Sequence, residues 1–327
     1  MAPTTRRRGG FFLPGDTSDD GTGQLGPAWV EFEAPATPTD LPVVLVHGGG
    51  GQSTDWMGVY GTGPSWAGAL VDAGHPVYLL DRPGHGRSPW DPARLGARTP
   101  WPDRSGVEGL FARPLGESSV DDHNDWAGID LGGSTPLAAM VAGSAGLAID
   151  TPRLQELDAA RLLDLLGRIG RAIVMTHSAG APAGWLAADA DPDSVAAVVA
   201  IEPLGPPYKE MGARGALTNG IACPPLRWHS RQSERTLPGL ARVPTLVVSG
   251  SASGREEDDC RTVDFLRGAA VPAAHLRLGE HDITGDGHGL VFERNVPLIV
   301  GCIRDWLASA LAADDHEHLS RRTLFET

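Results

Sequence analysis

The sequence predicts an α/β fold in which a mostly parallel sheet is covered by helices on both faces. Several apolar runs rich in valine, isoleucine and leucine are continuous rather than alternating, as in strands that are buried on both faces. These runs alternate along the chain with segments of helical pattern, which is typical of parallel sheets. Chemically unusual residues gather directly after the runs, where ligands bind in such sheets.

The expected elements follow one another with little ambiguity in their type. Strands are predicted near residues 29–32 and over residues 42–46, 76–80, 172–175, 194–201, 243–248 and 274–278. Helices are predicted over residues 65–73, 151–166, 181–190, 257–268 and 296–312. We expect residues 1–27 to be extended and the tail after Ala313 to fray.

Composition limits the function classes. The chain has 327 residues with a net charge of −14, 43 glycines and 27 prolines. The negative charge argues against nucleic acid and anionic membrane as partners, because phosphate binding needs clustered Lys and Arg. No run approaches the roughly 18 apolar residues of a membrane span, and the N-terminus lacks the apolar core of a signal peptide. We therefore expect a cytoplasmic protein.

Two long segments break the alternation of strands and helices. Residues 89–150 are rich in Pro, Gly, Trp and Asp, and residues 204–241 are also irregular. Loops of this length are uncommon in a compact domain unless they are functional. We expect one domain over residues 1–327, with these two segments inserted as a cap.

The three cysteines predict no disulfide framework and no metal site. Cys223, Cys260 and Cys302 are far apart and odd in number, and no Cys-x-x-Cys pair is present. A bridge between Cys223 and Cys260 stays open at this point.

The stretch with most chemical content is Thr176-His177-Ser178-Ala179-Gly180. It lies between a predicted strand and a predicted helix, which is the layout of a turn that presents a nucleophilic serine. Small residues are needed two positions before and after the serine. Gly180 satisfies this requirement, whereas Thr176 stands where glycine is expected. The alternative is an ordinary turn in which Ser178 caps the helix.

A nucleophilic serine needs a base, and the chain has eleven histidines. His288 follows the last predicted strand and precedes the last helix, so its loop can reach over the sheet toward Ser178. The second choice is His281. We interpret His177 as a pocket or packing residue and His85 as structural, and we expect His316 and His318 in the tail to be solvated.

The histidine needs an acid, and two positions compete. Glu202 interrupts an apolar run where a predicted strand ends, and its burial without a partner would be unfavourable. Asp258 and Asp259 follow the next strand, but these residues and the adjacent Glu256 and Glu257 fit a solvated helix start as well. We predict Glu202 as the acid.

The oxyanion of such a reaction needs two backbone N–H donors. One is expected from Ala179, directly after the serine. The other is expected from the glycine run after His47, with Gly49 the first choice and Gly50 the second, because glycine lets the backbone approach a substrate closely. A phosphate-binding loop is disfavoured, since neither G-x-G-x-x-G nor a following Lys-Ser or Lys-Thr is present.

Taken together, these motifs resemble the α/β-hydrolase superfamily over nearly the whole chain. The resemblance rests on His47-Gly48 after a strand, Asp81-Arg82-Pro83-Gly84-His85-Gly86-Arg87-Ser88, His177-Ser178-Ala179-Gly180 and a late Gly-His pair. A closer similarity is to bacterial carboxylesterases grouped around esterase 713. It rests on Phe11-Phe12, Gly61-Thr62-Gly63-Pro64-Ser65-Trp66, Pro76-Val77-Tyr78, Ile201-Glu202-Pro203 and His288 followed by Glu293-Arg294-Asn295.

The resemblance implies an α/β-hydrolase fold and ester hydrolysis through an acyl-enzyme, without a cofactor and often as a homodimer. It also implies an acid after the strand that follows the nucleophile, which favours Glu202. Thr176 and the run Gly48–Gly51 depart from the group's pattern.

The hypothesis is therefore a serine carboxylesterase that acts on a small or medium ester, with Ser178, His288 and Glu202 as its catalytic residues. The alternatives are a lactonase, an acyltransferase or a C–C bond hydrolase that uses the same residues, and a binding protein without activity. Gly50, His177 and Trp126 are predicted to line the substrate pocket, for which Trp90, Trp101 and Trp228 are further choices.

Overall fold

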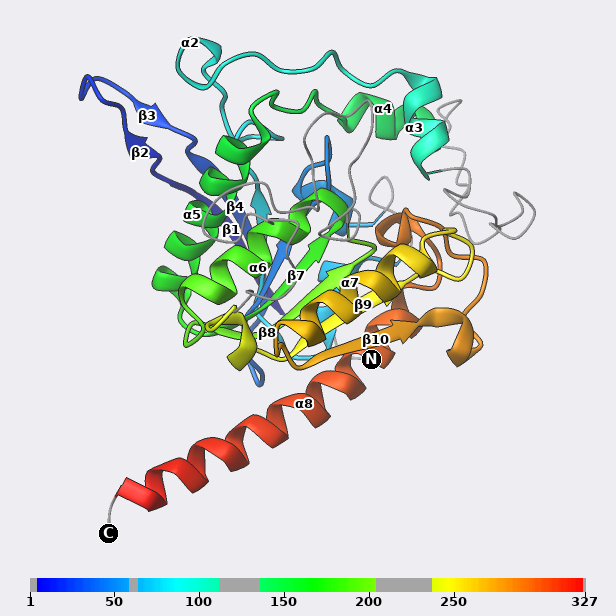
Figure 1. The fold of residues 1–327 in the computed structure, drawn as a ribbon. Helices are drawn as coiled ribbons and strands as arrows, with labels where there is room; N and C mark the ends of the chain where they lie inside the picture. Colours follow the sequence, from blue (N-terminus) through cyan, green and yellow to red (C-terminus); the bar gives the residue numbers. More distant parts are fainter. Residues whose placement is uncertain (1–4, 59–63, 112–135, 204–236, 326–327) are drawn as a thin grey trace.

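The computed structural model describes residues 5–58, 64–111, 136–203 and 237–325. It is built on an eight-stranded sheet with the order β1-β4-β6-β5-β7-β8-β9-β10 (Figure 1). The strands are β1 (Arg6–Leu13), β4 (Ala28–Pro35), β5 (Val43–Val46), β6 (Val77–Asp81), β7 (Ala172–His177), β8 (Val195–Ile201), β9 (Thr245–Ser249) and β10 (Ala273–Arg277). All neighbours from β6 to β10 in this order pair in parallel, whereas β4 pairs antiparallel with both β1 and β6. The predicted α/β fold with a mostly parallel sheet is confirmed.

Helices cover both faces of the sheet, as the continuous apolar strands require. On one face, Val44 and Val46 of β5 belong to an apolar cluster that includes side chains of α5 (Thr151–Ile169), α6 (Ala181–Ala190) and α7 (Glu256–Gly268). Val43 and Leu45 point to the other face and pack with α1 (Trp66–Asp72) and α8 (Val296–Phe325). Successive strand residues alternate between the two faces, so a strand with both faces covered must be apolar throughout. None of the helices in the described part of the chain is long and apolar enough to cross a membrane.

The order of the strands places the site. From β5 the chain turns to β6 on one side, and later returns to β7 on the other side of β5. The connections at the carboxyl ends of β5 and β7 therefore leave in opposite directions, which opens a crevice at this edge of an α/β sheet. The glycine run after His47 and the turn at Ser178 lie at these two strand ends.

Two elements differ from the sequence-based expectation. Residues 6–13 are extended, as predicted, but they form β1, an edge strand paired with β4. Gly9 and Gly10 permit the pairing, because a Cβ there would lie 2.7 and 2.2 Å from the rings of Phe32 and Trp29. A short hairpin, β2 (Asp16–Thr17) with β3 (Gln24–Leu25), follows β1.

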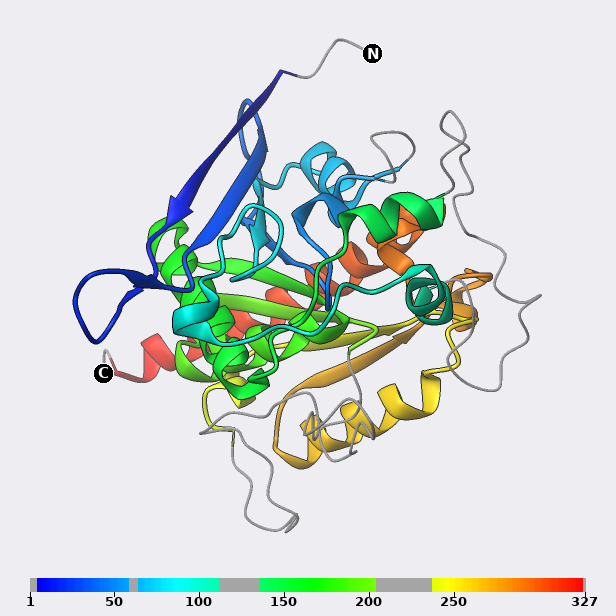
Figure 2. The ribbon, with the colours of Figure 1, turned by 90° about the horizontal axis from the view of Figure 1, so that it is seen from above.

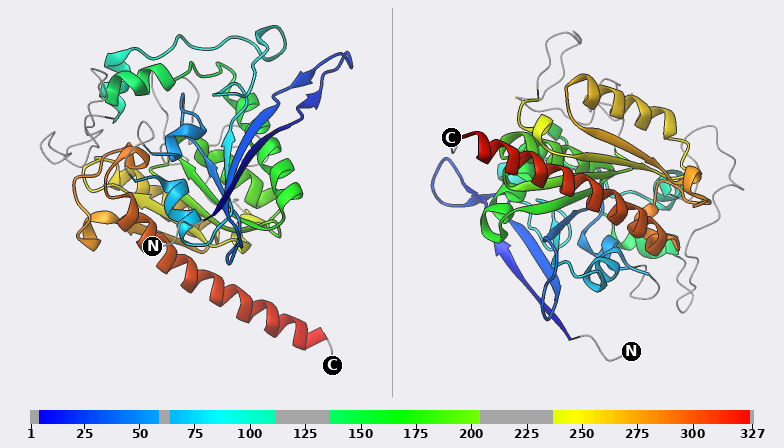
Figure 3. Two further views of the ribbon diagram at one scale, coloured as in Figure 1. Left: turned by 180° about the vertical axis from the view of Figure 1, so that it is seen from behind. Right: turned by 90° about the horizontal axis from the view of Figure 1, so that it is seen from below.

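The closing helix is the second difference. It was expected to end near Ala312, whereas α8 continues to Phe325 and projects beyond the body of the protein (Figure 3). The residues after Ala313 include neither glycine nor proline, so nothing in the sequence ends the helix there.

The described part of the first predicted insertion forms three short helices above the carboxyl edge of the sheet. They are α2 (Pro92–Leu95), α3 (Arg104–Phe111) and α4 (Pro136–Gly143); α3 contacts α4, whereas α2 lies apart from both when the molecule is seen from above (Figure 2). The two ends of the insertion are joined, because Arg98 forms a β-bridge with Ala148. Trp126, Cys223, Trp228 and most of the second insertion lie outside the described residues.

Candidate active site

Ser178 occupies a strained turn between β7 and α6. Its φ of +48° lies in the left-handed region, which is costly by about 1–3 kcal/mol for a residue with a side chain. The turn also depends on Gly180, since a Cβ there would lie 2.5 Å from the carbonyl oxygen of His47. The serine is 6% exposed, so its hydroxyl is held in a confined place rather than solvated.

Thr176 is accommodated by a glycine one turn into the following helix. Its Cγ2 lies 2.9 Å from the position that a Cβ on Gly184 would take, so the absence of a side chain at Gly184 makes room for the methyl group. The hydroxyl of Thr176 is buried and has no hydrogen-bond partner among the described residues. The side chain therefore packs against the start of the helix that follows the turn.

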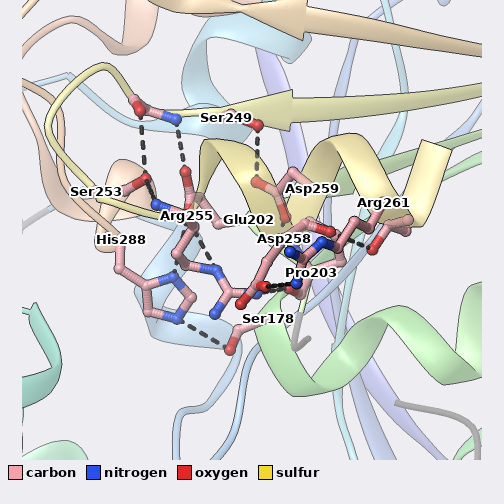
Figure 4. A network of polar contacts seen from close by, with 12 residues as sticks. Ser178, Glu202, Pro203, Ser249, Ser253, Arg255, Asp258, Asp259, Arg261 and His288 are labelled. Carbon is pink, nitrogen blue, oxygen red and sulfur yellow. Dashed lines mark hydrogen bonds and ion pairs between the residues drawn. The ribbon is translucent and has the colours of Figure 1, made fainter. Parts of the chain in front are cut away.

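Ser178, His288 and Glu202 form a continuous hydrogen-bonded chain (Figure 4). The hydroxyl oxygen of Ser178 lies 3.1 Å from His288 Nε2, and His288 Nδ1 lies 3.2 Å from Glu202 Oε2. An imidazole with its proton on Nδ1 can donate to the carboxylate and accept a hydrogen bond from the serine hydroxyl at Nε2. All three side chains are buried, so few water molecules compete for these bonds.

Glu202 is held by groups other than His288 as well. It follows β8 with a φ of +45°, and its Oε1 accepts a 2.6 Å hydrogen bond from the N–H of Gly250. The guanidinium of Arg255 lies 3.3 Å from Oε2. Burial raises the pKa of the Glu202 carboxyl, and the positive charge of Arg255 opposes that shift.

Asp259, the competing acid, is buried behind Arg255 rather than beside the histidine. Its Oδ2 accepts a 2.7 Å hydrogen bond from Ser249, and its Oδ1 lies 3.9 Å from Arg255 (Figure 4). Burial, followed by the nearby charge of Glu202, raises its pKa well above the ordinary value. The structure therefore brings Glu202, and not Asp259, into contact with His288.

The loop that carries His288 is anchored on both sides. The N–H of Gly287 donates to both carboxylate oxygens of the buried Glu293, at 2.9 and 3.1 Å, and Asn295 donates to Asp286. Gly250 is needed opposite this loop, since a Cβ there would lie 2.6 Å from the carbonyl oxygen of Asp286. These contacts fix the height of His288 above the sheet.

The other histidines have different places. His177 is buried, and it shares a 2.9 Å hydrogen bond with the carbonyl oxygen of His288 through Nε2. Burial, aided by His288, lowers the pKa of His177 to about 3, so the ring is neutral and Nε2 carries the donating proton. His281 is exposed, and the buried ring of His85 packs against His47.

The glycine run lies against the serine turn. A Cβ on Gly48 would lie 3.2 Å from Ser178 Cβ, and a Cβ on Gly49 would lie 3.3 Å from Ala179 Cβ. Gly50 has a φ of +70°, and its carbonyl accepts a hydrogen bond from the N–H of Ala145. The two predicted donor residues, Gly49 and Ala179, are thus neighbours.

Beneath both loops lies Arg82, which is 2% exposed and directly follows β6. Its guanidinium donates to Asp158 Oδ2 on α5 at 3.0 Å, to the carbonyl of Ala179 at 3.0 Å and to the carbonyl of Gly48 at 3.2 Å. Burial raises the pKa of Asp158 to about 6, although Arg82 opposes the shift.

A cavity of about 560 Å³ opens beside Ser178. Gly48, Gly49 and His177, which flank the serine, form part of its wall. The apolar part of the lining comes largely from α3, α4 and the loop before α8, and it consists of Met57, Phe111, Ala139, Met140 and Phe292. Polar lining residues include Arg8, Thr54, Asp55 and Ser144. Of the predicted pocket residues, His177 lies in this wall, Gly50 does not, and Trp126 lies outside the described residues.

Phe111 joins the apolar wall to the histidine. Its ring stacks on His288 with centroids 5.8 Å apart and contacts Phe292 edge-on.

The described part of the chain contains no group of three His, Cys, Asp or Glu side chains arranged to hold a metal ion. Within it, Cys260 and Cys302 are free thiols.

Three buried charged residues near the site did not emerge from the sequence as participants. The signal for Asp158 was its position within the leucine stripe of its helix, where a charged group requires a partner. Arg82 and Arg255 each follow a buried strand, at the edge where a site was expected. Their partners are far away in the sequence, so no local pattern links them.

Comparison with known proteins agrees with the geometry. A family model described as the alpha/beta hydrolase fold matches residues 42–213. A protein of a fungal species (strain ATCC 74256), named as a probable secreted lipase, is 30% identical over 311 residues, and the match covers 85% of each chain. The known structure of a bacterial esterase superposes with a TM-score of 0.67 over 95% of this chain and 98% of the other, at 17% identity, which shows the shared fold. The chain therefore belongs to the α/β-hydrolase family, as a hydrolase of the esterase or lipase type.

Proposed function

We propose that the protein is a serine carboxylesterase, with Ser178 as nucleophile, His288 as general base and Glu202 as the acid that orients the histidine. One observation carries the proposal: a serine in a strained left-handed turn lies 3.1 Å from a histidine that is itself 3.2 Å from a buried carboxylate. This arrangement provides what a weak hydroxyl nucleophile needs, namely a base and a third group that fixes the base.

In the first half of the reaction, Ser178 Oγ attacks the ester carbonyl carbon as its proton passes to His288 Nε2. The imidazolium that forms is stabilised by Glu202, and the negative charge on the carbonyl oxygen is stabilised by the N–H groups of Gly49 and Ala179. The proton then passes from His288 to the departing alkoxide, which leaves an acyl-enzyme. Water deprotonated by His288 hydrolyses the acyl-enzyme and regenerates Ser178.

The cavity supports an ester with an apolar portion. Its apolar wall of methionine and phenylalanine side chains stands on α3, α4 and the loop before α8, next to the serine. We propose that the described part of residues 89–150 acts as a cap that helps to set specificity, and that the lipase name of the fungal relative reflects a similar preference for apolar acyl groups.

The experiment is hydrolysis of a series of p-nitrophenyl esters under pre-steady-state conditions. We expect a burst of one p-nitrophenol per active site, followed by slower turnover, and loss of both phases in Ser178→Ala. Full turnover by folded Ser178→Ala would refute the mechanism. Product analysis with a competing alcohol distinguishes hydrolysis from acyl transfer.

The predicted cytoplasmic location and homodimer stay predictions. The fungal relative is named as a secreted protein, so cell fractionation is the relevant measurement of location. Light scattering during size-exclusion chromatography measures the oligomeric state.

A further inference from the structure

A single buried guanidinium connects the two loops that flank Ser178. Arg82 donates to the carbonyl of Gly48 in the loop after β5, and to the carbonyl of Ala179 in the turn after β7. The planar, multi-donor guanidinium can hold several acceptors in fixed directions, which a lysine ammonium does less well. Its third acceptor, Asp158, lies on α5 and is also buried.

The contact with Gly48 sets the direction of the Gly49 N–H. In a trans peptide the C=O of one residue and the N–H of the next point in opposite directions. The carbonyl of Gly48 accepts from Arg82 at 3.2 Å and from Nδ1 of His47 at 2.9 Å. His47 is neutral, because burial lowers its pKa to about 3, and its Nε2 accepts from the backbone N–H of Arg82 at 3.0 Å. The N–H of Gly49 must therefore point away from Arg82.

The second donor is the N–H of Ala179, and the hydrogen bond from Arg82 to the carbonyl of Ala179 constrains the peptide on the other side of this residue. The carbonyl of Ser178 is occupied by the N–H of Ala181 at the start of α6, so the N–H of Ala179 points away from that helix. The carbonyl of Ala179 is held by Arg82 at 3.0 Å. Both peptide planes next to Ala179 are thus constrained, and Gly49 packs directly against its Cβ.

We infer that Arg82, charge-balanced by Asp158, is a positioning residue that aligns the N–H groups of Gly49 and Ala179 as a two-donor oxyanion hole. The inference rests on the proposed serine mechanism and adds to it a pair that contacts neither substrate nor the reacting atoms. Asp158 is required because a guanidinium buried without a countercharge would be strongly destabilising. The pair links the ends of three strands, β5, β6 and β7, to α5.

The test must separate positioning from stability. Removal of Arg82 alone leaves Asp158 buried without its partner, so Arg82→Met can unfold the protein for reasons unrelated to catalysis. The double variant Arg82→Met/Asp158→Leu replaces the pair by apolar side chains, an exchange that is often neutral or stabilising for buried ion pairs. It removes the hydrogen bonds to both carbonyls without creating a buried charge.

For this double variant we expect kcat to fall about 100-fold, with KM within about threefold of the wild-type value. Loss of a single oxyanion donor reduces kcat by roughly 10²–10³-fold, and two misaligned donors belong in that range. A trifluoromethyl ketone, which Ser178 converts to a hemiketal oxyanion, is expected to lose affinity by the same factor. A substrate-like amide that forms no oxyanion should bind unchanged.

Arg161→Met is the matched control. Arg161 is also buried, lies on α5 one turn after Asp158, and pairs with Asp16 and Asp164 while donating to the carbonyl of Pro14. The variant therefore loses a buried guanidinium with two half-exposed carboxylate partners and one carbonyl partner, all away from Ser178, and kcat should stay within about threefold of wild type. Arg82→Lys, which keeps the charge but not the planar fork, should retain folding and lose at least tenfold in kcat.

Two results would overturn the inference. One is a folded double variant with wild-type kcat and ketone affinity, and the other is an equal loss of kcat in Arg161→Met. If instead wild-type esterase activity survives in Ser178→Ala, the proposed function itself fails, and this outcome is distinguishable from failure of the Arg82 inference alone.

Discussion

Two buried arginines flank Ser178, and they bind chemically different partners. Arg82 donates to two neutral backbone carbonyls, and its charge is balanced by Asp158. Arg255 lies beside Glu202, a carboxylate in contact with His288, and has Asp259 behind it. Each region thus combines one buried arginine with buried aspartate, yet only Arg255 faces groups that take part in proton transfer.

Because of this difference, Arg82 should affect the geometry of backbone groups, whereas Arg255 should affect the electrostatics of the groups that transfer protons. A carbonyl has no charge to titrate, so removal of Arg82 should change the rate equally at every pH. Glu202 must be ionised, and burial raises its pKa while Arg255 opposes that shift, so removal of Arg255 should change the pH at which the enzyme becomes active. The two regions can therefore be distinguished by the shape of a pH–rate profile.

The largest effect is expected for Glu202→Gln, which removes the charge that Arg255 balances. A neutral amide cannot stabilise the imidazolium of His288 and can favour the wrong tautomer, so kcat should fall by about 10³–10⁴-fold. Asp259→Asn is the control and should stay within about tenfold of wild type. Steady-state kinetics on a p-nitrophenyl ester measures both, and the reverse order of effects would move the acid to Asp259.

The second effect is a shift of the pH profile in Arg255→Met. Without the guanidinium the pKa of Glu202 rises further, because the positive charge that opposes the effect of burial is gone. The ionised carboxylate then requires a higher pH, so the acidic midpoint of kcat/KM should move up by about one pH unit or more. Arg255→Lys should shift it less, and the Arg82→Met/Asp158→Leu variant should not shift it. An unchanged midpoint in Arg255→Met would remove the distinction between the two arginines.

The third effect concerns stability and the aspartate partner of Arg82. The pKa of Asp158 is raised from 3.8 to about 6, so the folded protein holds this proton more tightly than the unfolded chain. Its contribution is full below about pH 4 and is lost as pH rises through 6. Asp158→Asn should therefore remove about 3 kcal/mol of the pH dependence of the free energy of unfolding in this window.

Denaturant titrations at several pH values measure this contribution. Asp164→Asn, at a half-exposed carboxylate on the same helix, serves as the control and should leave the slope unchanged. Identical slopes in wild type and Asp158→Asn would contradict the raised pKa.

The smallest effect is expected at Thr176, which lies between the two arginines and beneath the serine turn. Thr176→Val keeps the methyl that packs against Gly184 and removes a buried hydroxyl that has no partner among the described residues. We expect about 1 kcal/mol of added stability in thermal unfolding. Thr176→Ser, which keeps the hydroxyl and loses the methyl, should be destabilised, and the opposite ranking would show that the hydroxyl is satisfied.

The elements with strong local signals were predictable from the sequence. Continuous valine-rich runs identified β5, β7 and β8, and Pro152 with the leucine stripe identified α5, because these patterns follow from burial on known faces. The pairing of β1 with β4 was not foreseen, since it depends on Gly9 and Gly10 admitting the aromatic rings of a separate strand.

The candidate site also combines residues that local sequence patterns identify with residues that they do not. Ser178, His288 and Glu202 each stand at a strand end or in a loop of recognisable type, and the structure brings them together. Arg82 and Asp158 are 76 residues apart and meet only through the packing of α5 against the sheet. Contacts of this kind depend on tertiary geometry, which no periodic pattern encodes.

The most direct test of the mechanism is identification of the residue that reacts with a fluorophosphonate. The proposed mechanism predicts one equivalent of label, located by peptide mass spectrometry on Ser178, and labelling should be strongly slowed in Glu202→Gln. Stoichiometric label on another residue, or a fully active enzyme that resists the reagent, would contradict it.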